Sequence, residues 1–152
     1  MSFYQFKRSQ FFKQSPEELW SFISNPHNLK EITPDHMGFI ITSEDTSSEM
    51  YEGMIISYKV SPLLKIKTTW VTEITHIKNN SYFVDEQRIS PYKLWHHEHI
   101  LEPMDGGTMM IDIISYQPPF GFLGRIANRL IIQKKLNQIF EYRTTALERF
   151  FG

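Results

Sequence analysis

The stretch "QSPEELWSFISNP", residues 14–26, carries a complete set of signals for a short α-helix. Ser15 is a typical N-cap residue, Pro16 suits the first helical position, and two glutamates occupy the first turn. Apolar residues then recur at helical spacing until Asn25 and Pro26 end the segment. The local sequence therefore predicts a helix that begins and ends within about three turns.

The segments on either side of this helix are also predictable. Residues 3–13 alternate polar and aromatic side chains, which predicts a strand. Pro26 and Pro34 bracket a second short helix. The two helices have the outline of a helix-turn-helix, but neither carries the basic face that reading a DNA groove requires.

The composition excludes several classes of function. Lys and Arg number 16 against 17 Asp and Glu, so the formal net charge is −1 and there is no overall positive field to collect phosphates. We therefore expect no nucleic-acid partner. The chain has no cysteine, which excludes disulfides and thiolate chemistry. No apolar run approaches the ~20 residues of a membrane span, so we expect a soluble, cytoplasmic protein without stable membrane insertion.

Beyond the two short helices, residues 37–117 change to a period of two. Five or six β-rich segments alternate with turn signals such as Asn79-Asn80 and Asp105-Gly106. Spacing this short predicts antiparallel hairpins. After "QPPFGFLG" the period returns to 3.6 over about 30 residues, which predicts a helix roughly 45 Å long. Its predicted apolar stripe consists of Leu123, Ala127, Leu130, Leu136, Ile139, Phe140, Ala146, Leu147 and Phe150.

This order of elements predicts one α+β domain spanning residues 1–152. With "SPEELWSFISNPHNL", "FVDEQRISPYKLWHHEH", "GGTMMIDIISYQPPFG" and "PPFGFLGRIANRL", it resembles the helix-grip fold of the START-like (SRPBCC) superfamily. That superfamily includes polyketide cyclases and dehydrases, lipid-transfer domains and the birch-pollen allergen. The resemblance implies a curved antiparallel sheet of about seven strands, two short helices after the first strand, and one long C-terminal helix beside a cavity. It does not transfer an activity, because one fold hosts many chemistries.

Three histidines lie close together in "SPYKLWHHEHI", residues 90–100, inside a predicted strand. Because side chains alternate between faces of a strand, they do not form one cluster. A type I′ turn at Asp105-Gly106 sets the pairing of this strand with the next one. A turn centred on Pro91 sets Asp85 opposite His97 and Gln87 opposite Trp95. The pairs predicted across the first turn are Leu101 with Met110, His99 with Asp112, His97 with Ile114, and Trp95 with Tyr116.

One face of these three strands combines aromatic residues with a few polar groups, which is the composition of ligand pockets. The other face mixes aliphatic residues with Glu86, Arg88, His96 and Glu98. We therefore predict that the first face points into the cavity. The predicted ligand-binding residues on it are Phe83, Gln87, Trp95, His97, His99, Met110, Asp112, Ile114 and Tyr116.

Three interpretations of this face remain open. The histidines and carboxylates can form a hydrogen-bonded network that serves folding alone, or the same network can recognise the polar end of a bound ligand. In the third, His97 or His99 acts with Asp85 or Asp112 as a general base, and Tyr116 polarises a carbonyl or enolate oxygen. A His-x-His pair facing a carboxylate also suits zinc or iron, but this spacing is nonspecific. We therefore expect no metal and no cofactor.

The function that the sequence favours is binding of a small hydrophobic or amphipathic organic molecule, a lipid or a polyketide-like metabolite, in the cavity. One alternative is a cyclase or dehydratase that uses the His-Asp base. Another is a protein-interaction module, with a cavity filled by its own side chains. The sequence names neither the ligand nor any protein partner.

Overall fold

The computed structural model describes residues 3–44, 46–61 and 66–152. In chain order the elements are β1 (Tyr4–Phe12), α1 (Pro16–Ile23), the 3-10 helices η1 (Pro26–Ile32) and η2 (Asp35–Met37), β2 (Ile40–Ile41), β3 (Ile55–Val60), β4 (Thr68–Lys78), β5 (Tyr82–Ile89), β6 (Leu94–Met104), β7 (Gly107–Gln117), α2 (Gly121–Ala127), the π-helical turn η3 (Asn128–Ile132) and α3 (Gln133–Phe151).

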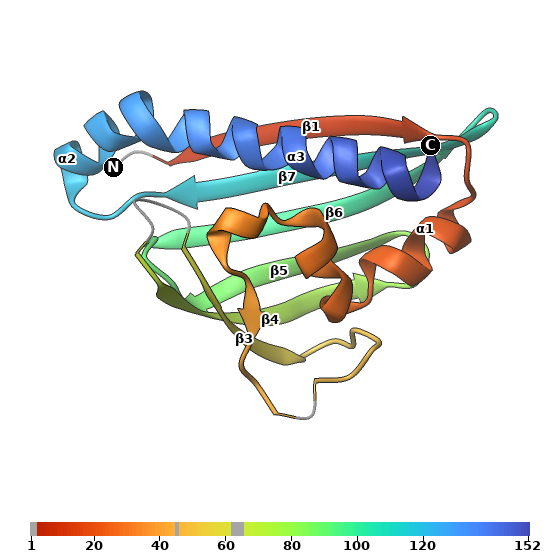
Figure 1. Ribbon diagram of the computed structural model, residues 1–152, viewed down its shortest axis with the longest axis horizontal. Helices are drawn as coiled ribbons and strands as arrows, with labels where there is room; N and C mark the ends of the chain where they lie inside the picture. Colours follow the sequence, from red (N-terminus) through yellow and green to blue (C-terminus); the bar gives the residue numbers. More distant parts are fainter. Residues whose placement is uncertain (1–2, 45, 62–65) are drawn as a thin grey trace.

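The strands form one antiparallel sheet with the order β1-β7-β6-β5-β4-β3-β2, so the first strand pairs with the last. Two register shifts between β4 and β5 interrupt the ladder, and such bulges bend a sheet. α3 runs along the β1 and β7 side, while α1 and the 3-10 helices lie in front of the middle strands (Figure 1). The predicted α+β architecture of seven strands and a long C-terminal helix is confirmed.

The N-terminal helices differ from each other in type. In α1 the Ser15 hydroxyl accepts from the backbone N–H of Glu18, and the Glu18 carboxylate accepts from the N–H of Ser15, which completes a capping box. Leu19 and Trp20 bury the apolar face of this helix. The second predicted helix is the seven-residue 3-10 helix η1, which Pro26 opens.

The register predicted for the central strands is confirmed. His97 pairs with Ile114 and His99 with Asp112 across β6 and β7, and Asp85 pairs with His97 across β5 and β6. The hairpin does turn at residues 105–106, between the paired Met104 and Gly107. The predicted turn type is wrong, because only Gly106 of the two central residues takes a positive φ and type I′ requires it at both.

The C-terminal helix has the predicted length, but three of its predicted core residues, Leu123, Leu130 and Phe150, are exposed. The residues of α3 that face the sheet are Leu136, Phe140, Ala146 and Leu147, as predicted. Leu123 and Leu130 point to solvent instead. The π-helical turn at 128–132 adds one residue to a turn through its i to i+5 hydrogen bond, which rotates α2 relative to α3 and brings Gly124 and Asn128 to the packed side.

Candidate functional site

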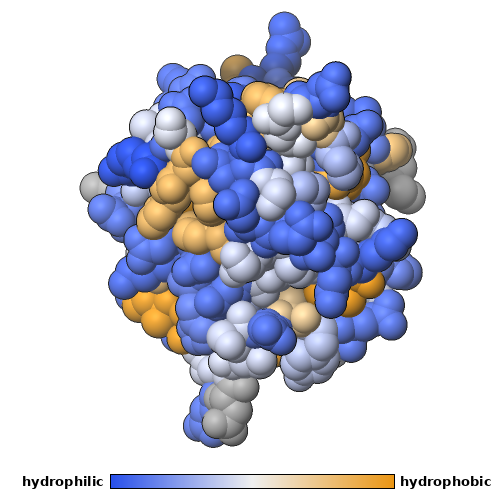
Figure 2. All heavy atoms as spheres, turned by 90° about the vertical axis from the view of Figure 1, so that its right-hand side faces the viewer, coloured by the Kyte–Doolittle hydropathy of each residue, from blue (hydrophilic) through white to orange (hydrophobic). Residues whose placement is uncertain are grey.

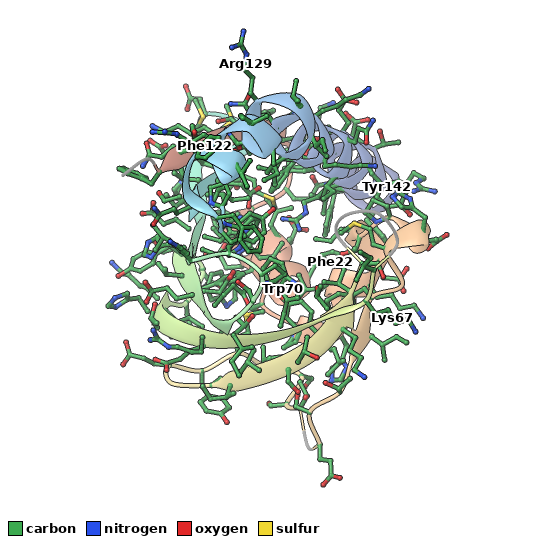
Figure 3. The ribbon with its side chains drawn as sticks, turned by 90° about the vertical axis from the view of Figure 1, so that its left-hand side faces the viewer. Phe22, Lys67, Trp70, Phe122, Arg129 and Tyr142 are labelled. Atoms are coloured by element: carbon green, nitrogen blue, oxygen red, sulfur yellow. The ribbon has the colours of Figure 1, made fainter. Side chains whose placement is uncertain are left out.

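A cavity of about 150 Å³ lies between the sheet and the C-terminal helix. Its walls are mostly aromatic and aliphatic. They come from the sheet, from the residues around η2, and from α3. Trp70 projects into the space between the curved sheet and the helix (Figure 3). Trp70 and Trp95 pack edge to face at one end of the cavity, and the Tyr92 ring packs against both at tilted angles.

Most of the predicted site residues line this cavity. His97 and His99 are buried, whereas His96 on the opposite face is half-buried and pairs with Glu86 at 3.0 Å. The face of the sheet that carries His97 and His99 is therefore its inner, buried face. The predicted residues that line the cavity are Phe83, Asp85, Gln87, Trp95, His97, His99 and Ile114.

Met110, Asp112 and Tyr116 lie outside the cavity lining. Met110 and Asp112 line two small voids beside Arg143. The Tyr116 hydroxyl donates to Asn128 Oδ1 at 2.6 Å, and burial raises the pKa of Tyr116 to about 12. Tyr116 thus anchors the π-helical turn, and the structure does not place its hydroxyl where it can polarise a ligand.

Two histidines and two aspartates form a closed buried network on the floor of the cavity. His99 Nε2 lies 2.7 Å from Asp85 Oδ2, and His97 Nε2 lies 2.8 Å from Asp112 Oδ1. The other nitrogens complete the ring, with His99 Nδ1 3.2 Å from Asp112 and His97 Nδ1 3.9 Å from Asp85. The two imidazole rings stack with their centroids 3.6 Å apart, so each carboxylate faces both rings from one side.

The network assigns different protonation states to the two histidines. Burial lowers the pKa of His99, but hydrogen bonds to Asp112 and Asp85 and the charges of these carboxylates outweigh it and raise the pKa above its ordinary value. Burial and the positive charge of His99 lower the pKa of His97 to about 4. The position of His99 between two carboxylates therefore favours its imidazolium form, whereas His97 is neutral at pH 7 and donates from Nε2 to Asp112.

Both carboxylates stay ionised although burial opposes it. Burial raises the pKa of Asp85, but the hydrogen bond from His99 and the neighbouring positive charges lower it below the ordinary value. The same balance lowers the pKa of Asp112, which accepts from both imidazoles. The unprotonated Nδ1 of His97 faces Asp85 and remains an acceptor on the Asp85 side of the network.

Arg143 of α3 supplies the second cation. Its Nη1 lies 3.7 Å from Asp112 Oδ1, and its guanidinium stacks on the Phe140 ring at 4.6 Å. With His99 and Arg143 positive and the two aspartates negative, the buried cluster has no net charge. Arg143 was not predicted as a site residue from the sequence. It lies between Phe140 and Leu147 at the spacing of the apolar stripe, where a charged residue is itself a signal.

A second polar group lies beside the first, and it joins the predicted Gln87 to Thr72 and Tyr58, which were not predicted from the sequence. Thr72 donates to Gln87 Oε1 at 2.9 Å, and Gln87 Nε2 donates to the Tyr58 hydroxyl at 3.3 Å. Burial and the charge of Asp85 raise the pKa of Tyr58 to about 12. The neutral Tyr58 hydroxyl accepts from Gln87, and Thr72 Oγ1 lies 3.3 Å from it, so the Tyr58 hydrogen can point either to Thr72 or to a ligand oxygen.

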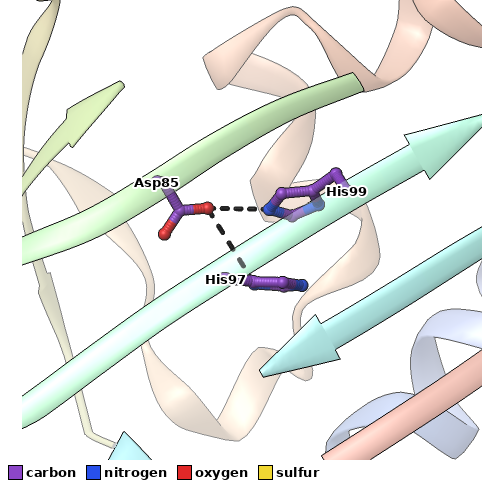
Figure 4. Close-up of side chains that lie close together, drawn as sticks. All are labelled: Asp85, His97 and His99. Carbon is purple, nitrogen blue, oxygen red and sulfur yellow. Dashed lines mark hydrogen bonds and ion pairs between the residues drawn. The ribbon is translucent and has the colours of Figure 1, made fainter. Parts of the chain in front are cut away.

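Asp85, His97 and His99 form the one group among the described residues that can hold a metal ion (Figure 4). Their ligand atoms lie within 4.8 Å of one another. The 2.7 Å hydrogen bond between Asp85 and His99 occupies the position that an ion would take, so binding a metal requires His99 to lose a proton.

The cavity approaches the surface beside η2. A groove of about 490 Å³ between residues 34–37 and α3 is lined in part by Asp35, Gln138 and Tyr142. It shares three lining residues with the cavity, namely Met37, Lys135 and Ile139. These three side chains therefore mark the route between the cavity and solvent.

The sheet, the long C-terminal helix and the short helices after β1 together form the helix-grip fold. Solved structures share it at low sequence identity. Ms6760 from Mycobacterium smegmatis matches with a TM-score of 0.66 and 13% identity, over 96% of this chain and 92% of that one. Major latex-like protein 151 from Panax ginseng matches with a TM-score of 0.70 and 11% identity, over 98% and 97%. Ara h 8.0201 matches with a TM-score of 0.60 and 13% identity, over 97% and 99%.

Identities this low show the fold alone. No protein-family model matches the chain, and no curated protein sequence matches it. No helix of the described residues is long and apolar enough to cross a membrane.

Proposed function

We propose that this protein binds a small, largely apolar organic molecule in the cavity between its sheet and its C-terminal helix. The observation that carries the proposal is the distribution of polar groups in an otherwise apolar cavity. They form one strip across the floor of the sheet, from Tyr58 on β3 through Thr72 and Gln87 to Asp85 and His97. A few convergent polar groups among aromatic walls are typical of sites that orient a ligand.

The size of the cavity limits the ligand. About 150 Å³ suits a single ring or a short branched chain, since an engineered apolar cavity of that size in another protein holds benzene. Pockets for larger organic ligands usually measure about 300–1,000 Å³. A long-chain lipid therefore requires α3 and the η2 segment to separate, whereas a small aromatic or short aliphatic molecule does not.

The polar strip also indicates which groups the ligand carries. The Tyr58 hydroxyl has a hydrogen to donate and suits a carbonyl or ether oxygen. The Nδ1 of His97 and the carboxylate of Asp85, 3.9 Å apart, are both acceptors and suit an O–H or N–H group. A hydroxy-ketone or a phenol with an adjacent carbonyl offers both kinds of group.

Catalysis by a His-Asp base receives less support from the geometry. His97 is neutral but weakly basic, because the same burial that keeps it neutral lowers its pKa to about 4. His99 holds its proton between two carboxylates. The interaction-module alternative also receives less support, because it expects side chains to fill the cavity.

Ligand binding can be tested by tryptophan fluorescence, since Trp70 and Trp95 line the cavity and Trp20 lies in the core outside it. We expect single-ring hydroxy-carbonyl compounds to change the emission of the wild-type protein with a saturable, one-to-one dependence. The Trp20→Phe variant should keep this change, and the Trp70→Phe, Trp95→Phe double variant should lose it.

The proposal fails if no member of such a panel saturates, and if native mass spectrometry of protein from its own source detects no bound molecule. It also fails if Ile139→Trp, which places a larger side chain in the cavity wall, binds a positive compound as tightly as the wild type does.

A further inference from the structure

The net charge of −1 conceals a strong separation of charge along the molecule. β1, β4 and β6 begin at one end of the sheet, where β3, β5 and β7 end, because Tyr116 pairs with both Tyr4 and Trp95 while Val60 pairs with Thr68. The described segments that meet there, 53–61, 66–72, 87–97 and 113–140, contain no Asp or Glu. The basic residues at this end include Lys67, Lys93, Arg125 and Arg129, whereas Arg88 is paired with Glu73 and Glu86. This end is therefore locally basic.

The helix α2 at the same end exposes its large apolar residues to the solvent. Phe122, Leu123 and Ile126 are 62%, 58% and 49% exposed, and Leu130 in the adjoining turn is 67% exposed. The side that packs on the protein instead contains Gly124 and Asn128. A helix on the surface of a monomeric protein normally buries its large apolar residues.

Two local features hold α2 in this orientation. A Cβ on Gly124 would lie 2.0 Å from the carbonyl oxygen of Pro119, so only glycine permits this close approach. Asn128 is fixed by the hydrogen bond from Tyr116. Just before the helix, Phe120 has φ 68° and is 76% exposed. A bulky residue in the left-handed region is strained, so the surrounding structure holds this exposed position in place.

Basic residues lie beside the exposed apolar ones. Arg125 and Arg129, at i and i+4, run along one side of the apolar stripe, and both are exposed. Figure 3, which views this end directly, shows Arg129 projecting away from the molecule and Phe122 on α2. The opposite end, in Figure 2, is covered mostly by hydrophilic side chains with separate hydrophobic patches.

We propose that this end docks onto the surface of an anionic lipid bilayer. Phe120, Phe122, Leu123 and Ile126 enter the boundary between headgroups and acyl chains, while Arg125 and Arg129 contact the anionic headgroups. An apolar helix face flanked by basic residues suits such a surface, because burial of apolar area and attraction to anionic lipids act together. The protein lies on the membrane and does not span it. This docking does not depend on the cavity being occupied.

A second copy of the chain fits this surface less well. A symmetric pair would place Arg125 and Arg129 of one copy against the same residues of the other, without a carboxylate in the acid-free segments to balance them. Exposed apolar residues at this end also come from separate segments, as with Phe122 on α2 and Ile89 at the end of β5. Side chains that project from several segments suit a deformable lipid surface better than one flat protein face.

The test is sedimentation of the purified full chain with vesicles of phosphatidylcholine alone and of phosphatidylcholine with 30% phosphatidylserine. We expect binding to the anionic vesicles, weaker binding at 500 mM NaCl, and little binding to the neutral ones. Arg125→Gln and Arg129→Gln should each lower the partition coefficient about fivefold.

The apolar contribution is tested by Phe122→Gln, with Tyr51→Gln as the matched control. Tyr51 is similarly exposed, at 57%, but it lies before β3, at the opposite end of the sheet. Phe122→Gln should lower partitioning about tenfold, because a buried aromatic side chain is lost, and Tyr51→Gln should not change it.

Three results would overturn the proposal. The first is equal binding to neutral and anionic vesicles, or none to either. The second is equal loss of binding in Phe122→Gln and Tyr51→Gln. The third is a concentration-dependent dimer of the wild type, seen by light scattering, that Phe122→Gln abolishes. That result would assign the surface to a second copy of the chain.

Discussion

Asp85 lies directly opposite His97 in the β5–β6 ladder, yet its short hydrogen bond, 2.7 Å, runs diagonally to His99. Asp112 does the reverse: it lies opposite His99, and its shorter hydrogen bond, 2.8 Å, is with His97. Each carboxylate therefore couples to the imidazole that is not its direct neighbour. The two histidines are locked as a stacked pair, and only one of them can hold an extra proton.

The neutral state of buried His97 makes stability depend on pH. Its pKa is about 4 in the folded protein and near the ordinary 6.5 in the unfolded chain, so between these values only the unfolded chain binds the proton. The free energy of unfolding should therefore fall by up to about 3 kcal/mol as the pH decreases from 6.5 to 4. Urea unfolding across this range measures the slope.

The matched variants for this slope are His97→Gln and His76→Gln. Glutamine can still donate to Asp112 but does not titrate, so His97→Gln should flatten the pH dependence. His76 is exposed, and its replacement should leave the slope unchanged. Equal slopes in the wild type and in His97→Gln would contradict the assigned protonation state.

The raised pKa of His99 predicts the opposite trend on the alkaline side. The folded protein holds this proton more tightly than the unfolded chain does, so the contribution is complete below pH 6.5 and is lost as the pH rises through the folded pKa. Stability should thus be greatest near pH 6.5. The imidazole proton signals of His99 in NMR spectra should persist above pH 7, and their disappearance at pH 6.5 would argue against the imidazolium.

Arg143 should be needed for stability because it balances a buried carboxylate. Arg143→Met leaves the cluster with a net negative charge and should destabilise the fold by about 3 kcal/mol. Arg143→Lys keeps the charge and should cost less. The control Arg149→Met, at an exposed position of the same helix, should stay within about 0.5 kcal/mol of the wild type.

A double variant tests whether the effect of Arg143 acts through Asp112. If the two side chains are coupled, Asp112→Asn combined with Arg143→Met should cost less than the sum of the single changes. Additive costs would mean that Arg143 stabilises the protein through its packing on Phe140 and not through charge.

The Tyr58 hydroxyl should discriminate among ligands. For a compound with a carbonyl group, Tyr58→Phe should raise the dissociation constant about tenfold, because a hydrogen bond is lost and Gln87 loses its acceptor. For a compound of similar size without a polar group, the change should be small. Titration calorimetry measures both, and equal losses for the two compounds would exclude a direct contact with the hydroxyl.

The metal content of the purified protein gives a further test. Because a cation at Asp85, His97 and His99 must displace the proton of a short hydrogen bond, we expect less than stoichiometric zinc or iron in purified protein and no change in Tm with EDTA. Elemental analysis and thermal unfolding check this. A rise in Tm with zinc that Asp85→Asn abolishes and Asp112→Asn preserves would contradict it.

The strands and their register could be predicted because local signals determine them. Asp105-Gly106 fixed the β6–β7 register, and alternation then assigned every side chain of both strands to a face. The cavity-lining roles of Tyr58 and Arg143 were missed for different reasons. Arg143 interrupts an apolar stripe and could have been noticed, whereas Tyr58 pairs with Gln87 only through the curvature of the whole sheet.

The orientation of α2 could not be predicted from periodicity. Leu123 and Leu130 lie about 140° and 120° from Leu136 on an ideal helix, so they do not continue its stripe, and the sequence does not mark where an extra residue enters a turn. The net charge did not reveal the basic end of the molecule either, because a total of −1 is compatible with both an even and an uneven distribution of charged residues.

Because of the π-helical turn at 128–132, the number of residues in this segment determines which side of α2 faces the solvent. Deleting one of its residues would restore ideal helical continuity and swing α2 by about 100° about the common axis. Phe122 would leave its outward position, and Asn128 would move away from Tyr116. A single codon therefore decides whether α2 presents Phe122 to the solvent or to the protein interior.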